Sequence, residues 1–214
     1  MSNFRYTRPD SFPPVVKNLI IINILVWIAQ VLLDPQYDLT SRLALWPFGS
    51  EQFQPYQIAT HMFAHAARNA GGGIVIYHIL FNMFGLWMFG RILENVWGGK
   101  RFLIFYLVCG VGAAFVHLLV QYLTGSFSEA IGASGAIMGI FAAFAYLFPN
   151  TELYIMLIPI PVKAKWAVLG LAAIDIFGSI QGGDNVAHFA HLGGALTGFI
   201  LVLIWNKTNK KRFY

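Results

Sequence analysis

Apolar blocks of about 20 residues, separated by short polar or basic stretches, run through most of this chain of 214 residues. A helix of that length crosses the roughly 30 Å hydrocarbon core of a bilayer. Charged residues make up only 11% of the chain, less than half of the roughly 25% found in soluble domains. The sequence therefore predicts an all-α polytopic membrane protein and excludes a soluble globular domain, a fibrous chain and a disordered one.

Six of the apolar blocks are long enough to span a membrane. We predict spans at Val15–Leu33, Ile74–Leu93, Phe102–Thr124, Ile131–Phe148, Val162–Ile180 and Val186–Trp205. The fifth is the least regular, because Pro159 and Pro161 fix its start and Asp175 interrupts it. Residues 1–14 and 207–214 are then cytoplasmic tails on either side of one six-span domain, residues 15–206, and residues 1–14 do not have the pattern of a cleavable signal peptide.

The basic residues are distributed very unevenly about these spans. Of 14 Lys and Arg residues, only Arg42 and Arg68 fall on one side. Positive residues concentrate on the cytoplasmic side, so both termini are predicted to be cytoplasmic, as in a multi-pass protein of the bacterial inner membrane. The net charge of +5 thus reports topology and attraction to anionic lipid, and no nucleic-acid partner is expected. A single cysteine, Cys109, leaves no disulfide framework and no cysteine metal site.

The loop at about residues 34–73 is too apolar for a solvated linker and too interrupted to span. Its aromatic residues favour a place in the outer membrane interface. No inverted repeat of the kind seen in transporters is found in the chain.

Polar side chains lie inside the predicted spans, where burial is costly unless the group is paired. His78 and Asn82 share one face of the second span, Ser134 lies near the start of the fourth, and His188 and His191 lie near the start of the sixth. These three spans run in the same direction, which places the side chains at one depth, roughly 5–12 Å below the outer surface. We therefore predict one polar site formed by three helices.

Glycines on two of these helices allow the close approach that such a site needs. Gly135 and Gly139 lie on the fourth span, and Gly194 and Gly198 follow His191 on the sixth. Small residues at this spacing let helix backbones come together in lipid. A serine hydroxyl could then reach an imidazole within about 3 Å.

Three motifs, in this order, resemble the signatures of the rhomboid intramembrane serine proteases: His78-Ile79-Leu80-Phe81-Asn82, Gly132-Ala133-Ser134-Gly135, and Ala190-His191-Leu192-Gly193-Gly194 with Gly198. The resemblance covers about residues 17–206 and corresponds to the minimal six-span form. It implies a rhomboid-like helical bundle and an intramembrane endopeptidase, a hydrolase that cleaves transmembrane segments of other membrane proteins near the outer leaflet.

The resemblance also implies a role for each matching residue. Ser134 is expected to be the nucleophile and His191 the general base, since His191 and not His188 has glycines three and seven positions later. His78 and Asn82, with the Ser134 backbone N–H, are expected to form the oxyanion hole. No cofactor and no metal are implied.

Gly132, Ala133 and Met138 are expected to bind substrate, and Met138 stands where family members often have an aromatic ring. Tyr56-Gln57 replaces a Trp-Arg pair that is common in the loop. Glu94 resembles a structural acidic position. The implied partners are lipid and membrane proteins with a single transmembrane helix, cut after a small residue; the oligomeric state stays open.

No carboxylate is close to His191 in sequence. Asp175 and Asp184 are the nearest candidates, and neither is well placed along the chain, so the sequence favours a Ser–His dyad with an acyl-enzyme intermediate. Asp175 is interpreted as a helix cap or a loop anchor.

Three other functions remain as alternatives. A transporter or channel also buries His, Asn and Asp, but would be expected to place them at the midplane. A zinc metalloprotease could use His61 and His65 with His78 or His188, although the chain lacks an HExxH motif. An inactive scaffold would be expected to lack the serine or the histidine.

We expect Ser134→Ala and His191→Ala each to abolish cleavage of a model transmembrane substrate, because nucleophile and base act as a unit. His188→Ala should be much milder. The measurement is the cleavage rate of each purified, folded variant. Appreciable cleavage by Ser134→Ala would contradict the serine mechanism, and a dead His188→Ala beside an active His191→Ala would reverse the choice of histidine.

Overall fold

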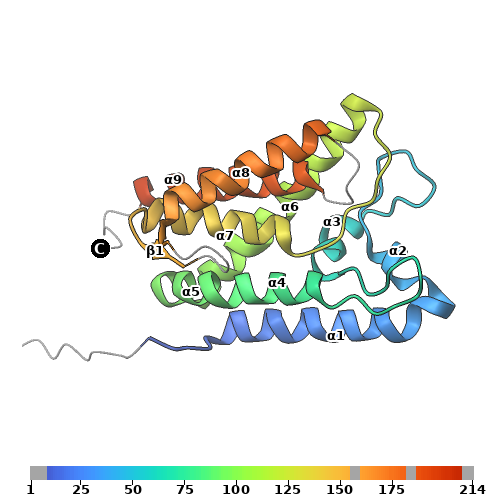
Figure 1. Ribbon diagram of the computed structural model, residues 1–214, viewed down its shortest axis with the longest axis horizontal. Helices are drawn as coiled ribbons and strands as arrows, with labels where there is room; N and C mark the ends of the chain where they lie inside the picture. The colour runs from blue at the N-terminus through green and yellow to red at the C-terminus, as the bar shows by residue number, and fades with distance from the viewer. Residues whose placement is uncertain (1–8, 155–159, 182–186, 209–214) are drawn as a thin grey trace, which may run out of the picture.

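The computed structural model describes residues 9–154, 160–181 and 187–208, which form a bundle of helices with one two-stranded antiparallel ribbon (Figure 1). The elements are α1 Pro14–Tyr37, α2 Leu39–Leu43, α3 Gln57–Thr60, η1 (3₁₀) His61–Phe63, α4 Tyr77–Gly85, η2 (a π-helical turn) Leu86–Gly90, α5 Arg91–Trp97, α6 Gly99–Thr124, α7 Ser134–Leu147, β1 Glu152–Leu153, β2 Val162–Lys163, α8 Ala164–Gln181 and α9 His188–Thr208. The prediction of an all-α membrane bundle is confirmed.

Each predicted span contains a helix. Within the described part of the chain, α1, α6 and α9 are individually long and apolar enough to cross a membrane, and α7 is a shorter apolar helix. The second predicted span is continuous helix from α4 through η2 to α5, and the fifth is α8. The protein is thus a multi-pass membrane protein, and the count of six spans remains a prediction.

Neighbouring long helices run in opposite directions, so α4, α7 and α9 share one direction (Figure 1). Their first turns therefore lie toward the same end of the bundle. Four features lie at the opposite end of the bundle: the start of α1, the end of α9, and the junctions α5–α6 and β2–α8 (Figure 1). Among the described basic residues, six lie at these helix ends and junctions, on the side where the sequence predicts the two termini: Lys17, Lys100, Arg101, Lys163, Lys165 and Lys207.

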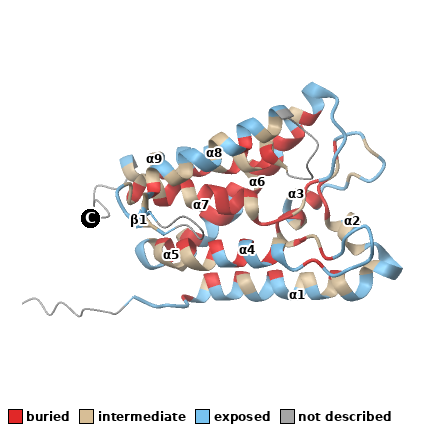
Figure 2. Ribbon diagram, in the orientation of Figure 1, coloured by how far each residue is buried: buried red, intermediate tan, exposed pale blue. Residues whose placement is uncertain are grey.

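The central helix of the bundle is α7, which packs most extensively against α9, while both pack against α6. Most residues of α7 are buried, whereas the outer helices expose apolar faces (Figure 2). With 14 residues, α7 is only about 21 Å long and is shorter than the hydrocarbon core. A helix of this length does not by itself reach across the whole core.

The glycines of α7 and α9 bring the two backbones into direct contact, which confirms the packing prediction. A Cβ at Gly194 would overlap the carbonyl oxygen of Gly135, and a Cβ at Gly198 would lie 2.6 Å from the Cα of Gly139. Backbone atoms cannot rotate away as a side chain can. Any larger residue at these positions must separate the helices.

Most helix boundaries differ from the prediction by a few residues, and specific contacts explain two of the differences. The first helix continues past Leu33 to Tyr37 even though Pro35 lacks the N–H that would bond the Val31 carbonyl. Arg68 Nη2 donates to that carbonyl at 2.8 Å, so the helix loses no partner there.

The fourth predicted span starts at Ser134 instead of Ile131, because the preceding segment is bound elsewhere. Gly132 has φ +122° and donates its N–H to the His61 carbonyl at 2.9 Å. Ala130 and Leu45 exchange two backbone hydrogen bonds, at 2.9 and 3.0 Å. These contacts attach the segment before Ser134 to the long loop between α1 and α4.

The long loop is organised around one buried side chain, Gln57. Its Nε2 donates to the carbonyls of Arg42 and Gln52, and its Oε1 accepts from the backbone N–H groups of Trp46 and Gln54. The loop therefore packs as a defined unit on the bundle, held together by Gln57, the second residue of the Tyr56-Gln57 pair.

Glu94 has the structural role expected of an acidic residue at this position. The buried carboxylate accepts hydrogen bonds from the backbone N–H groups of Val15 and Val16, at 3.0 and 2.7 Å. It therefore caps the first turn of α1, which has no cap from its own Pro13.

We expect Gly194→Ala to lower the melting temperature in detergent by several degrees, because overpacking a tight core contact costs about 1–3 kcal/mol. Gly170→Ala in α8 is the matched control, since a Cβ there meets nothing within 4 Å. It should leave stability unchanged or raise it slightly. Equal melting temperatures for the two variants would contradict the proposed backbone contact.

Candidate functional site

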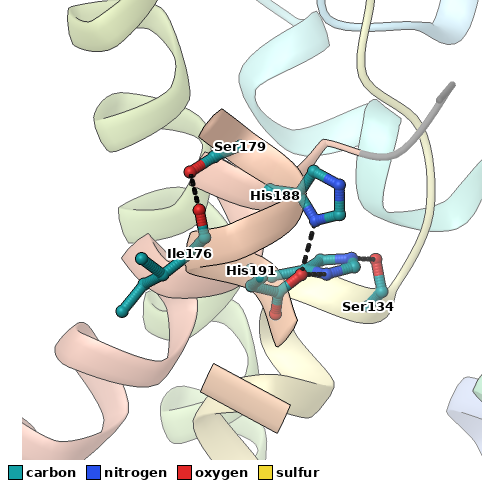
Figure 3. Close-up of polar contacts among 6 residues, drawn as sticks. Ser134, Ile176, Ser179, His188 and His191 are labelled. Atoms are coloured by element: carbon teal, nitrogen blue, oxygen red, sulfur yellow. Dashed lines mark hydrogen bonds and ion pairs between the residues drawn. The ribbon is translucent and has the colours of Figure 1, made fainter. Parts of the chain in front are cut away.

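Ser134 and His191 come together although 57 residues separate them. Ser134 is the first residue of α7 and His191 lies in the first turn of α9. The distance from Ser134 Oγ to His191 Nε2 is 2.7 Å (Figure 3). This is a normal hydrogen-bond length for a hydroxyl that donates to an imidazole nitrogen, and it pairs a potential nucleophile with a potential base.

The other ring nitrogen of His191 faces a carboxylate. His191 Nδ1 lies 2.9 Å from Asp175 Oδ1, and His188 Nδ1 lies 2.8 Å from the same oxygen. The expectation that no carboxylate is well placed beside His191 is therefore wrong for Asp175, whose carboxylate meets two side chains in the first turn of α9. Asp184 lies outside the described residues.

Sequence separation concealed this contact. Asp175 is in α8, 16 residues before His191, and the two meet because α8 packs antiparallel against α9. One signal was available: Asp175 is an ionisable residue within the apolar stretch that follows Lys165 in the fifth predicted span, which by itself indicates a function or a buried partner.

His78 lies close to Ser134, next to Gly132. Its Nδ1 accepts a hydrogen bond from the Ala66 N–H at 3.2 Å, so a neutral ring carries its proton on Nε2. A Cβ at Gly132 would lie 2.9 Å from His78 Nε2 and 3.5 Å from Ser134 Oγ. The missing side chain of Gly132 therefore leaves a space that a donor and a nucleophile both border.

Asn82 lies one turn after His78 on α4 and is largely buried. Its Nδ2 donates to the His78 carbonyl at 2.9 Å, which leaves the second amide hydrogen for another acceptor. The remaining predicted site residues, Ala133 and Met138, have buried side chains. The Ala133 N–H points to His65 Nε2 at 3.5 Å.

A cavity of about 710 Å³ reaches this region through His78 and His188, which form part of its wall. Polar side chains on its wall include His78, His117, Gln121, Glu129 and His188. A polar cavity of this size can hold water, which a hydrolytic reaction at Ser134 would need.

Within the described ranges, one group of side chains could hold a metal ion: Asp175, His188 and His191, whose ligand atoms lie within 4.8 Å of one another. The alternative set around His61 and His65 is not assembled there. His61 Nδ1 is instead within 2.9 Å of the Gln57 carbonyl.

His61 and His65 lie in the loop outside the predicted spans, and both are buried. Burial is the main cause that lowers the pKa of His61 to about 4 and the pKa of His65 to about 3. Both rings are therefore neutral at pH 7. The neutral His65 ring can accept a hydrogen bond from the backbone beside Ser134, which a protonated ring could not.

Comparison with known proteins finds a matching domain that contains the site residues described above. The sequence pattern that defines the Rhomboid domain matches residues 52–207. Presenilin-associated rhomboid-like protein A, mitochondrial, of Danio rerio is 38% identical over 138 residues, which is 62% of this chain and 36% of that protein.

Two further relatives come from other organisms. Rhomboid-like protein 11, chloroplastic, of Arabidopsis thaliana is 32% identical over 159 residues, 71% of this chain and 53% of that protein. Rhomboid protein 1, mitochondrial, of Saccharomyces cerevisiae is 29% identical over 126 residues, 58% of this chain and 36% of that protein. The chain thus spans about a third of the length of the mitochondrial relatives that it matches.

We expect the protein to lose stability as the pH falls from about 6.5 toward 4. In that window the unfolded state binds protons at His61 and His65, whose unfolded pKa is 6.5, while the folded state does not. Each such imidazole contributes a slope of up to about 1.4 kcal/mol per pH unit. His65→Gln should flatten the dependence of melting temperature on pH in detergent, and an unchanged slope would contradict the assignment.

Proposed function

The chain belongs to the rhomboid family, and on that premise we propose that it is an intramembrane serine endopeptidase with Ser134 as nucleophile and His191 as general base. The observation that carries the proposal is the 2.7 Å contact between Ser134 Oγ and His191 Nε2. It joins two residues that the family motifs pair, at the first turns of two helices that lie backbone to backbone.

The reaction follows from this contact. His191 Nε2 takes the Ser134 hydroxyl proton as Oγ attacks the carbonyl carbon of the substrate peptide bond. The tetrahedral intermediate collapses, the C–N bond breaks and the leaving amine takes the proton from His191. Water then attacks the acyl-enzyme, with His191 again as base, to release the acid product and restore the serine.

Negative charge on the intermediate requires hydrogen-bond donors. His78 Nε2–H, the free amide hydrogen of Asn82 and the Ser134 backbone N–H are the proposed set. The tautomer argument for His78 and the space at Gly132 support it. The Ser134 N–H is among the first amides of α7, which have no acceptor within the helix, and the positive end of the helix favours an oxyanion there.

The proposed substrate is the single transmembrane helix of another membrane protein. Peptide bonds within a helix are shielded, so the segment must unwind before Ser134 can attack. The short α7 helix and the polar cavity support cleavage at a recessed but water-accessible level. Gly132, Ala133 and Met138 are proposed to bind the unwound segment, and the family resemblance favours a small residue before the scissile bond.

The proposed arrangement in the membrane is a six-span domain, residues 15–206, between cytoplasmic tails. The asymmetry of Lys and Arg supports this orientation. A bacterial inner membrane is the proposed location; the names of the relatives place those proteins in mitochondria and chloroplasts.

The proposal is tested with the full chain reconstituted in liposomes with a single-span substrate that has alanine before the cleavage site. We expect wild type to cleave this substrate and to react with a fluorophosphonate, whereas Ser134→Ala should neither cleave the substrate nor be labelled. EDTA or phenanthroline should not change the wild-type activity. Absence of cleavage by wild type, or cleavage by Ser134→Ala, would contradict the proposal. Activity lost on chelation and restored by zinc would favour a metalloprotease.

A graded loss should separate the oxyanion donors from the nucleophile. Removing one such donor typically lowers kcat by about 10²–10³, so His78→Ala and Asn82→Ala should retain weak cleavage and slow labelling. Asn95→Ala is the matched control for Asn82→Ala, because Asn95 bonds Asp10 in the N-terminal segment. Wild-type kcat in both site variants would contradict the oxyanion assignment.

A further inference from the structure

We propose that Asp175 is a positioning residue for His191, so that the reacting unit is Ser134–His191–Asp175 and not a dyad. The inference rests on the proposed function, because it assigns a role within the same site.

The first argument is the geometry of the His191 ring. Its two nitrogens are engaged at opposite ends, Nε2 by Ser134 Oγ at 2.7 Å and Nδ1 by Asp175 Oδ1 at 2.9 Å. An ionised carboxylate only accepts hydrogen bonds, so Nδ1 must carry the ring proton. Nε2 is then unprotonated and directed at the serine hydroxyl, which is the tautomer that a general base requires.

The second argument is the setting of the carboxylate. Asp175 is the only acidic residue of α8 and is 6% exposed. A carboxylate buried in an apolar helix is unfavourable unless it is paired. His188 and His191 both meet Oδ1, from nearly perpendicular ring planes at 86°. The two imidazoles therefore supply the hydrogen bonds that let Asp175 remain at this site.

The third argument is the fit between α8 and α9. Gly178 lies three residues after Asp175, and a Cβ there would overlap the His188 ring. The absence of a side chain lets α8 approach α9 at the level where Asp175 meets the two histidines. Helix α8 is thus shaped, independently of the hydrogen bonds, to bring its carboxylate to the first turn of α9.

The expected effect is on the chemical step. When His191 takes the Ser134 proton, its ring becomes positively charged, and the Asp175 carboxylate stabilises that charge while it holds the ring in place. Substrate that binds beside Ser134 does not need this contact. Loss of the carboxylate should therefore lower kcat and leave KM nearly unchanged.

The experiment compares Asp175→Asn, Asp175→Glu and Ser134→Ala with wild type in liposomes. Glu152→Gln is the matched carboxylate-to-amide control, since Glu152 is exposed in β1. We expect Asp175→Asn to lower kcat by at least tenfold, with a ceiling of about 10⁴, and to change KM by less than about twofold. Asp175→Glu, which keeps the charge, should recover part of the loss.

Fluorophosphonate labelling is measured per folded molecule, so that poor folding is not mistaken for poor catalysis. We expect slower labelling of folded Asp175→Asn. Three outcomes would overturn the inference, provided that wild type is active and Ser134→Ala is inactive. They are a wild-type labelling rate for Asp175→Asn, a kcat of Asp175→Asn reduced by less than tenfold, and no recovery of kcat by Asp175→Glu. Inactive wild type or active Ser134→Ala would instead overturn the proposed protease itself.

Discussion

Direct contact between the backbones of α7 and α9 is the constraint on which the site depends. Helices in lipid gain little from the hydrophobic effect when they associate, so close packing and internal hydrogen bonds must hold them together. The pairing of Gly135 with Gly194, and of Gly139 with Gly198, supplies that closeness. Ser134 Oγ and His191 Nε2 are within 2.7 Å only because the first turns of both helices meet there.

The loop between α1 and α4 completes the site from the other side. Gln57 organises the loop through four hydrogen bonds, and the backbone carbonyl of His61 accepts a hydrogen bond from the Gly132 N–H. The Ala66 N–H in turn bonds His78 and determines its tautomer. The loop between α1 and α4, which the sequence predicts to lie in the membrane interface, therefore holds the segment before α7 in place. It also fixes which nitrogen of His78 carries the proton.

Several polar groups in this bundle are paired with partners that are distant in the chain. Glu94 accepts from the first turn of α1, and Arg68 bonds the carbonyl that Pro35 leaves free. Asp175 follows the same rule with His188 and His191. In an apolar surrounding an unpaired polar group is costly, so a pairing of this kind can serve structure and chemistry at once.

The sequence by itself determined the elements that depend on local composition and spacing. The apolar blocks predicted six helical ranges, and the structure has a helix in each of them. The glycine spacing predicted the contact of α7 with α9. The family motifs singled out Ser134 and His191. Only the tertiary structure decided that Ser134 is the first residue of α7 and that Asp175 faces His191. Both depend on contacts between segments far apart in the chain, where hydrogen-bond partners are chosen by packing and not by sequence distance.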